Sequence, residues 1–167
     1  MPSQKVLELL ERNKKFNTAL APPYIADVSR RLHSPGGPRV TCSDPRVIPE
    51  QYFEAAVIRN AGGRTSDAIR SLAALDTIGN TDTVIIVHHT DCGMAHMPDE
   101  AVRQRLKGRA PELSREIDQM TFGEILDVDE SVREDIALLK ASPLLSKDLT
   151  ILGYSLDIHT GLLAEVQ

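Results

Sequence analysis

The pattern of apolar and polar positions predicts an α/β fold. Short runs rich in β-branched residues predict four strands, at 39–42, 55–58, 83–87 and 149–156, and a short edge strand at 162–166. Apolar residues at helical spacing predict helices at 3–16, 65–78, 99–107 and 129–140. The third strand is apolar throughout and has helices on both sides in the sequence, as is typical of parallel sheets. We therefore expect a mainly parallel central sheet flanked by helices.

The segments between these elements predict one domain over residues 1–167. Proline and glycine interrupt 21–38, a single helical turn is expected at 49–53, and 108–128 is predicted to be a polar connection. We expect residues 1–20 to form a helical arm that packs on a partner subunit. Packing of this helix on its own domain is the alternative.

Composition excludes several classes of function. Hydrophobic residues make up 41% and charged residues 26% of the 167, which is ordinary for a globular domain. The net charge of -5 argues against binding to nucleic acid or anionic membranes. No apolar run approaches the roughly 20 residues of a membrane helix, and no signal-peptide core is evident. We expect a cytoplasmic protein, where two cysteines favour metal binding or chemistry over a disulfide.

A candidate metal site is built from the ends of two predicted strands. Cys42 ends the first strand, and His89 and Cys92 follow the third. If these strands are neighbours, with the second strand outside the first, their carboxyl ends bring the three side chains together. Two thiolates and an imidazole match the ligand preference of zinc. Three protein ligands are typical of a catalytic zinc site, which keeps a position for water or substrate.

Asp44 and Arg46 lie two and four residues after Cys42. The Asp44 carboxylate can be a fourth metal ligand, which would close the site. Alternatively it can pair with Arg46, which would keep it ionised and away from the metal, where it can accept a hydrogen bond from a bound water. The sequence leaves both arrangements open.

These motifs together resemble the β-class carbonic anhydrases, in the small microbial and fungal form. The segment from Cys42 to Arg46 fits the Cys-x-Asp-x-Arg motif of that family, and His89 to Cys92 fits its His-x-x-Cys motif. The segment 57–63, ending in Gly62 and Gly63, is similar to the family's glycine-bearing segment beside the active site. We expect these two glycines to line the substrate pocket and to allow a tight backbone path near the metal.

The resemblance implies one Zn2+ per subunit, held by Cys42, His89 and Cys92, and a catalytic pair formed by Asp44 and Arg46. It implies reversible hydration of carbon dioxide to bicarbonate and a proton by zinc-bound hydroxide, in a homodimer or a higher homo-oligomer. The alternatives are hydrolysis of carbon disulfide or carbonyl sulfide on the same fold, and a zinc-binding homologue with little catalysis. Redox use of the cysteines is a weaker alternative.

Two departures from the family pattern concern the pocket and the proton route. The stretch 49–57 is shorter than the family pattern, and no proton shuttle can be assigned.

Among the remaining polar residues, His88 is expected to be a hydrogen-bonded neighbour, Arg59 structural and His159 exposed. Asp91 is expected either to support the site or to be solvated.

Overall fold

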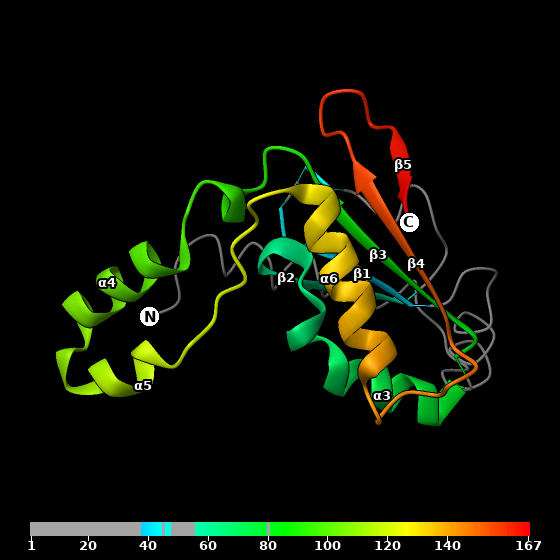
Figure 1. The fold of residues 1–167 in the computed structure, drawn as a ribbon, viewed down its shortest axis with the longest axis horizontal. Helices are drawn as coiled ribbons and strands as arrows, with labels where there is room; N and C mark the ends of the chain where they lie inside the picture. The colour runs from blue at the N-terminus through cyan, green and yellow to red at the C-terminus, as the bar shows by residue number, and fades with distance from the viewer. Residues whose placement is uncertain (1–37, 45, 48–55, 80) are drawn as a thin grey trace, which may run out of the picture.

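The structure is a computed structural model that describes residues 38–44, 46–47, 56–79 and 81–167. Its centre is a five-stranded sheet in the order β2-β1-β3-β4-β5 (Figure 1). The strands are β1 (Arg39–Cys42), β2 (Val57–Asn60), β3 (Thr83–His89), β4 (Thr150–Leu156) and β5 (Leu163–Val166). The predicted N-terminal helix, the turn at 49–53 and the shortened stretch around Phe53 lie outside the described residues.

Four strands run parallel, and the fifth closes the sheet antiparallel. Strand β1 lies between β2 and β3, with Val40 opposite both Ile58 and Ile86. This order confirms that the first and third strands are neighbours. Strand β2 covers 57–60 instead of the predicted 55–58, and β3 continues through both histidines instead of ending at Val87. The histidines therefore belong to the sheet.

The helices agree with the sequence pattern apart from their ends and one omission. They are α3 (Ile69–Gly79), α4 (Asp99–Arg109), α5 (Ser114–Asp118) and α6 (Val128–Ala141). In the described part of the chain, four 3-10 turns accompany them: η2 (Ala61–Gly63), η3 (Thr65–Asp67), η4 (Gly93–Ala95) and η5 (Pro111–Leu113). The predicted helix at 65–78 begins as η3, and the predicted polar connection at 108–128 contains η5 and α5. None of the described helices is long and apolar enough to cross a membrane.

Helices α3 and α6 pack on the same face of the sheet. Their apolar side chains join those of β1 and β3 in one buried cluster, formed by Val40, Ala68, Leu72, Val84, Ile86, Leu139 and Leu145. Gly153 allows α6 to approach β4, since a Cβ there would lie 2.4 Å from Val132 Cγ1. This close contact fixes α6 over the end of β3, beside the candidate site.

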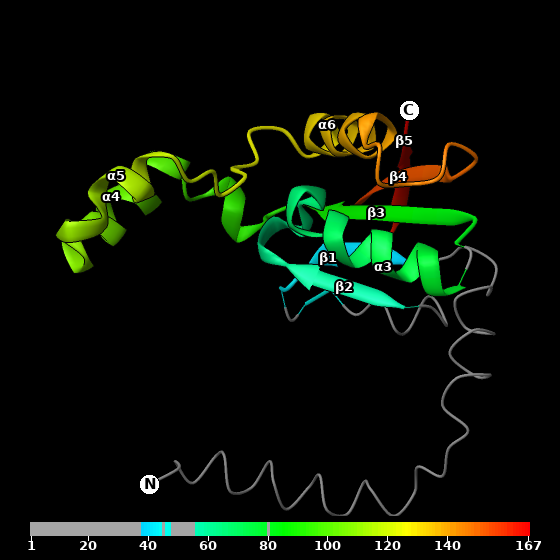
Figure 2. The same cartoon turned by 90° about the horizontal axis from the view of Figure 1, so that it is seen from below.

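Helices α4 and α5 form a hairpin that extends away from the sheet beyond the carboxyl end of β3 (Figure 2). Its base is tied by Asp99, whose carboxylate accepts hydrogen bonds from the backbone N–H groups of Phe122 and Glu124 at 2.8 and 3.0 Å. The Glu124 carboxylate accepts in return from the Asp99 backbone at 2.8 Å. The chain therefore returns to the site after the hairpin.

Candidate metal centre

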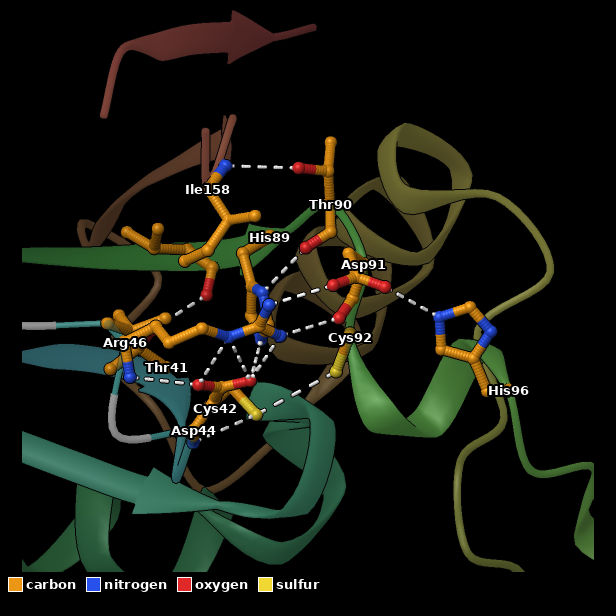
Figure 3. A network of polar contacts seen from close by, with 12 residues as sticks. Thr41, Cys42, Asp44, Arg46, His89, Thr90, Asp91, Cys92, His96 and Ile158 are labelled. Atoms are coloured by element: carbon orange, nitrogen blue, oxygen red, sulfur yellow. Dashed lines mark hydrogen bonds and ion pairs between the residues drawn. The ribbon is translucent and has the colours of Figure 1, made fainter. Parts of the chain in front are cut away.

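The three predicted metal ligands converge at the carboxyl ends of β1 and β3 (Figure 3). Cys42 ends β1, His89 ends β3, and Cys92 follows one turn later. All three are buried, and one ligand atom from each lies within 4.8 Å of the others. The two Sγ atoms are 3.8 Å apart. Among the described residues this is the one group of histidine, cysteine and acidic side chains with such spacing.

The His89 ring is oriented as a metal ligand. Its Nδ1–H donates to the Thr90 carbonyl at 2.8 Å. Thr90 is itself fixed at the end of β4, because its N–H donates to Leu156 and its hydroxyl accepts from Ile158. Nε2 is buried without a hydrogen-bond partner among the described residues. A metal between this nitrogen and the two thiols would satisfy it, so the donor set fits zinc.

The electrostatics of the cluster also suit a cation. The contact between the Cys92 and Cys42 sulfur atoms lowers the pKa of Cys42 to about 4, against the opposing effect of burial. Contacts with His89 and with the backbone N–H of Asp44, 3.4 Å from the sulfur, lower it further. The same contact between thiols, with burial, raises the pKa of Cys92. Negative charge is therefore stabilised at Cys42, where a metal would share it.

His88 lies on the opposite face of the sheet, as adjacent strand residues must. Its Nδ1 is 2.7 Å from Ser131 Oγ, and its Nε2 is 3.2 Å from both the Gly63 carbonyl and Asp135 Oδ2. Both ring nitrogens thus have partners. The prediction that His88 is a hydrogen-bonded neighbour is confirmed.

Gly62 and Gly63 form a tight turn against the end of β1. Both have positive φ, 72° and 75°, a conformation that favours glycine. A Cβ on Gly63 would lie 2.9 Å from the Cys42 backbone nitrogen. The expectation of a tight backbone path beside Cys42 is confirmed; the role of these glycines in a substrate pocket stays a prediction.

Asp44 is paired with Arg46 in the structure. Arg46 Nη2 donates to Asp44 Oδ2 at 2.8 Å, and Nε lies 3.1 and 3.2 Å from the two carboxylate oxygens. These hydrogen bonds lower the pKa of Asp44 to about 2 and raise that of Arg46. Asp44 Oδ2 remains 3.9 Å from His89 Nε2. Of the two arrangements left open by the sequence, the structure has the carboxylate on the arginine.

Two further residues hold the loop that follows Cys42. Arg59 donates to the carbonyls of Cys42, Asp44 and Val47 at 3.2, 2.7 and 2.8 Å, which confirms its structural role. Asp91 accepts from Arg46, and its carboxylate also lies 2.8 Å from His96 Nε2. The sequence left open whether Asp91 supports the site or is solvated. Its contact with Arg46 joins residues 45 positions apart, and no local sequence pattern predicts such a contact.

An apolar wall completes the site. Ile125 belongs to one buried cluster with both cysteines, and Met94 and Val128 pack against this cluster. The Ile125 N–H donates to the Met94 carbonyl at 3.1 Å, which ties the chain returning from the hairpin to the turn after Cys92. The sequence did not single out Ile125 and Val128, since apolar positions in the polar connection at 108–128 have no distinctive spacing.

The chain is similar to known proteins over most of its length. Beta-carbonic anhydrase 1 of Mycobacterium tuberculosis is 36% identical over 136 residues, which cover 76% of this chain and 79% of that protein. The chain belongs to the β-class carbonic anhydrase family. No family model matches it. A carbonic anhydrase structure from Streptococcus mutans, 30% identical, covers 100% of both chains with a TM-score of 0.81. One from Glaciozyma antarctica, 34% identical, covers 94% of this chain and 95% of that one, with a TM-score of 0.76.

β-Carbonic anhydrases are zinc enzymes, and Cys42, His89 and Cys92 can form the zinc site of this member. The family also includes relatives with another activity. A carbon disulfide hydrolase from an Acidianus strain is 35% identical over 147 residues, 72% of each chain. Membership of the β-carbonic anhydrase family therefore does not by itself specify the substrate.

Proposed function

We propose that this protein catalyses the reversible hydration of carbon dioxide to bicarbonate and a proton, with zinc held by Cys42, His89 and Cys92. The observation that carries the proposal is the pairing of Asp44 with Arg46, which leaves three protein ligands in the cluster. Three protein ligands are typical of catalytic zinc, and four of structural zinc. When bound, zinc supplies a Lewis acid that makes water nucleophilic near neutral pH.

The residues around the cluster have distinct roles in this proposal. Asp44, ionised by its contact with Arg46, accepts a hydrogen bond from the attacking water and turns its lone pair toward carbon dioxide. The apolar wall of Met94, Ile125 and Val128 suits an uncharged substrate and limits access of bulk water. The oxygen of water bonds to carbon, one proton leaves for solvent, and bicarbonate is released.

Hydrolysis of carbon disulfide is the second candidate, favoured by the similarity to carbon disulfide hydrolases. The ligand set and the Asp44–Arg46 pair serve either substrate, because both are linear molecules attacked at carbon. Stopped-flow hydration of carbon dioxide with a pH indicator, beside sulfide release from carbon disulfide, separates the two. Zinc binding without either activity between about pH 6 and 9, which brackets the titration of zinc-bound water, would favour the non-catalytic alternative.

Replacement of Asp44 tests the role of the pair. Asp44→Ala is expected to keep zinc and to lose about 100-fold or more in kcat/KM, as general acid–base groups contribute about 10²–10⁴-fold. Zinc content is measured by atomic absorption and activity by stopped flow. A sharp fall in zinc content would instead identify Asp44 as a metal ligand.

A homodimer is also part of the proposal, since the resemblance implies one and β2 is an edge of the sheet among the described strands. Sedimentation velocity at micromolar concentration tests it, and a monomer would contradict it. Cytoplasmic location stays a prediction.

A further inference from the structure

We propose that Asp91 is a positioning residue that anchors Arg46 from the side opposite Asp44 and so keeps the Asp44 carboxylate away from the metal. Figure 3 shows the Arg46 guanidinium between the two aspartates. Nη1 donates to Asp91 Oδ2 and Nη2 donates to the Asp91 carbonyl, both at 2.8 Å. With the contacts of Nε and Nη2 to Asp44, all three guanidinium nitrogens are engaged.

The backbone of Asp91 is shaped for this contact. Asp91 is the one described residue other than glycine with a positive φ, 53°. Aspartate, asparagine and glycine tolerate this left-handed conformation better than other residues. Here Asp91 offers its backbone carbonyl and its carboxylate to the same guanidinium. Both contacts must break before the rigid planar group can turn.

The anchor matters because Asp44 has a second position within reach. Its Oδ2 lies 3.9 Å from His89 Nε2, so a small side-chain movement takes the carboxylate to the ligand cluster. An arginine held only by Asp44 could follow that movement. An arginine that is also held by Asp91 opposes it, and the equilibrium favours the Asp44–Arg46 pair.

The expected size of the Asp91 effect follows from the solvent exposure of the Arg46–Asp91 ion pair. The Arg46 and Asp91 side chains are 46% and 47% exposed. One ion pair at this exposure shifts an equilibrium by a factor of about two to five. We therefore expect Asp91 to tune the distribution between the two positions of Asp44 and to have little influence on folding.

Two variants of Asp91 and one control variant distinguish the anchoring of Arg46 from a general structural change around Asp91. Asp91→Gly removes the carboxylate and keeps the left-handed backbone, whereas Asp91→Asn keeps a neutral acceptor for Arg46. His96→Gln is the matched control, because it changes the other, 67% exposed partner of Asp91 and leaves the contact with Arg46 in place. The expected effect decreases in the order Asp91→Gly, Asp91→Asn, His96→Gln.

Two measurements, neither of which is activity, report the effect. Nitrogen-edited NMR of the zinc-free protein measures solvent exchange of the Arg46 Nε–H, expected to be about two- to fivefold faster in Asp91→Gly than in wild type. Crystal structures of the zinc-loaded proteins at one pH measure the fraction of Asp44 on zinc, relative to that on Arg46. This ratio is expected to rise by the same factor in Asp91→Gly and to stay within the wild-type error in His96→Gln.

The inference rests on the proposed metal site, and its failure can be told apart from failure of the proposed function. Unchanged exchange and unchanged Asp44 positions in both Asp91 variants would overturn it, as would an equal change in His96→Gln. If the wild type is active and both Asp91 variants leave the Arg46 exchange and the Asp44 positions unchanged, only the role of Asp91 is refuted. A wild type inactive toward carbon dioxide whose Asp91 variants show the expected changes would refute the proposed function alone.

Discussion

Two histidine–aspartate pairs lie on opposite faces of the sheet at the end of β3, and they differ in what their hydrogen bonds leave unsatisfied. On one face His88 lies 3.2 Å from Asp135, and both of its ring nitrogens have partners. On the other face His89 lies 3.9 Å from Asp44, and its Nε2 has no hydrogen-bond partner among the described residues. The chemical groups are the same, so only their surroundings separate a structural histidine from a candidate metal ligand.

The difference extends to the acids. Asp135 is buried, and its carboxylate accepts one hydrogen bond from the Thr65 backbone N–H at 2.9 Å, besides its contact with His88. Asp44 is bound to an exposed arginine that also contacts Asp91. A fully satisfied buried network stabilises one conformation. A partly exposed pair beside an unsatisfied nitrogen is free to respond to a ligand.

Removal of the buried acid is expected to have the largest effect on folding. Asp135→Ala leaves the buried Thr65 N–H without its acceptor and removes the carboxylate that lies 3.4 Å from Arg64 and 3.2 Å from His88. It should cost about 3–5 kcal/mol in the free energy of unfolding. Asp44→Ala, the matched change on the other face, should cost clearly less. Urea denaturation of the zinc-free proteins measures both. Equal losses would show that the two faces do not differ in the proposed way.

For metal affinity, replacement of the two histidines is expected to show the opposite order: the larger effect should come from His89, on the face of Asp44, and the smaller from His88, on the face of Asp135. His89→Gln should weaken zinc binding more than about 100-fold, since even residues outside the ligand shell contribute 10–100-fold. His88→Gln should weaken it less than about tenfold, because His88 faces away from the cluster. Competition with a chromophoric chelator measures both affinities. A greater loss in His88→Gln would mean that the ligand is misassigned.

The sequence contained enough to bring the three candidate ligands together but not to predict their supporting contacts. Cys42 and His89 could be placed together because parallel strands present their carboxyl ends at one edge of the sheet. Side chains alternate between the two faces of a strand, so His88 could be excluded as a ligand on the face of His89. Both arguments use local pattern. Ser131, one partner of His88, comes from α6, 43 residues further along the chain, and the Gly63 carbonyl lies 25 residues before it. Such contacts depend on how helix and sheet pack, which no local pattern contains.

The same limit explains the errors in the predicted elements. The segment 108–128 looked like a polar connection because α5 has only five residues, too few to show a periodicity. Its return to the site depends on reciprocal hydrogen bonds between Asp99 and Glu124, 25 residues apart. The apolar run ends at Val87 and so predicts a strand that stops before the two histidines, whereas β3 continues to His89. Their burial became evident only with the neighbouring strands in place.

Gly63 connects the two faces, so its replacement should affect both. Its carbonyl lies 3.2 Å from His88 Nε2, and an added Cβ would lie 2.9 Å from the Cys42 backbone nitrogen. Gly63→Ala should cost about 2 kcal/mol in the free energy of unfolding, from overpacking and from its positive φ. It should also weaken zinc binding, because Cys42 must shift to make room.

Gly93→Ala is the matched control for this change. Gly93 follows Cys92 directly, but a Cβ there meets no atom within 4 Å. We expect a neutral or slightly stabilising effect of less than about 1 kcal/mol on folding and no change in zinc affinity. The same denaturation and chelator measurements apply to both variants. If Gly63→Ala altered stability without zinc affinity, the structural and metal-binding faces would be independent, and the turn at Gly63 would not couple them.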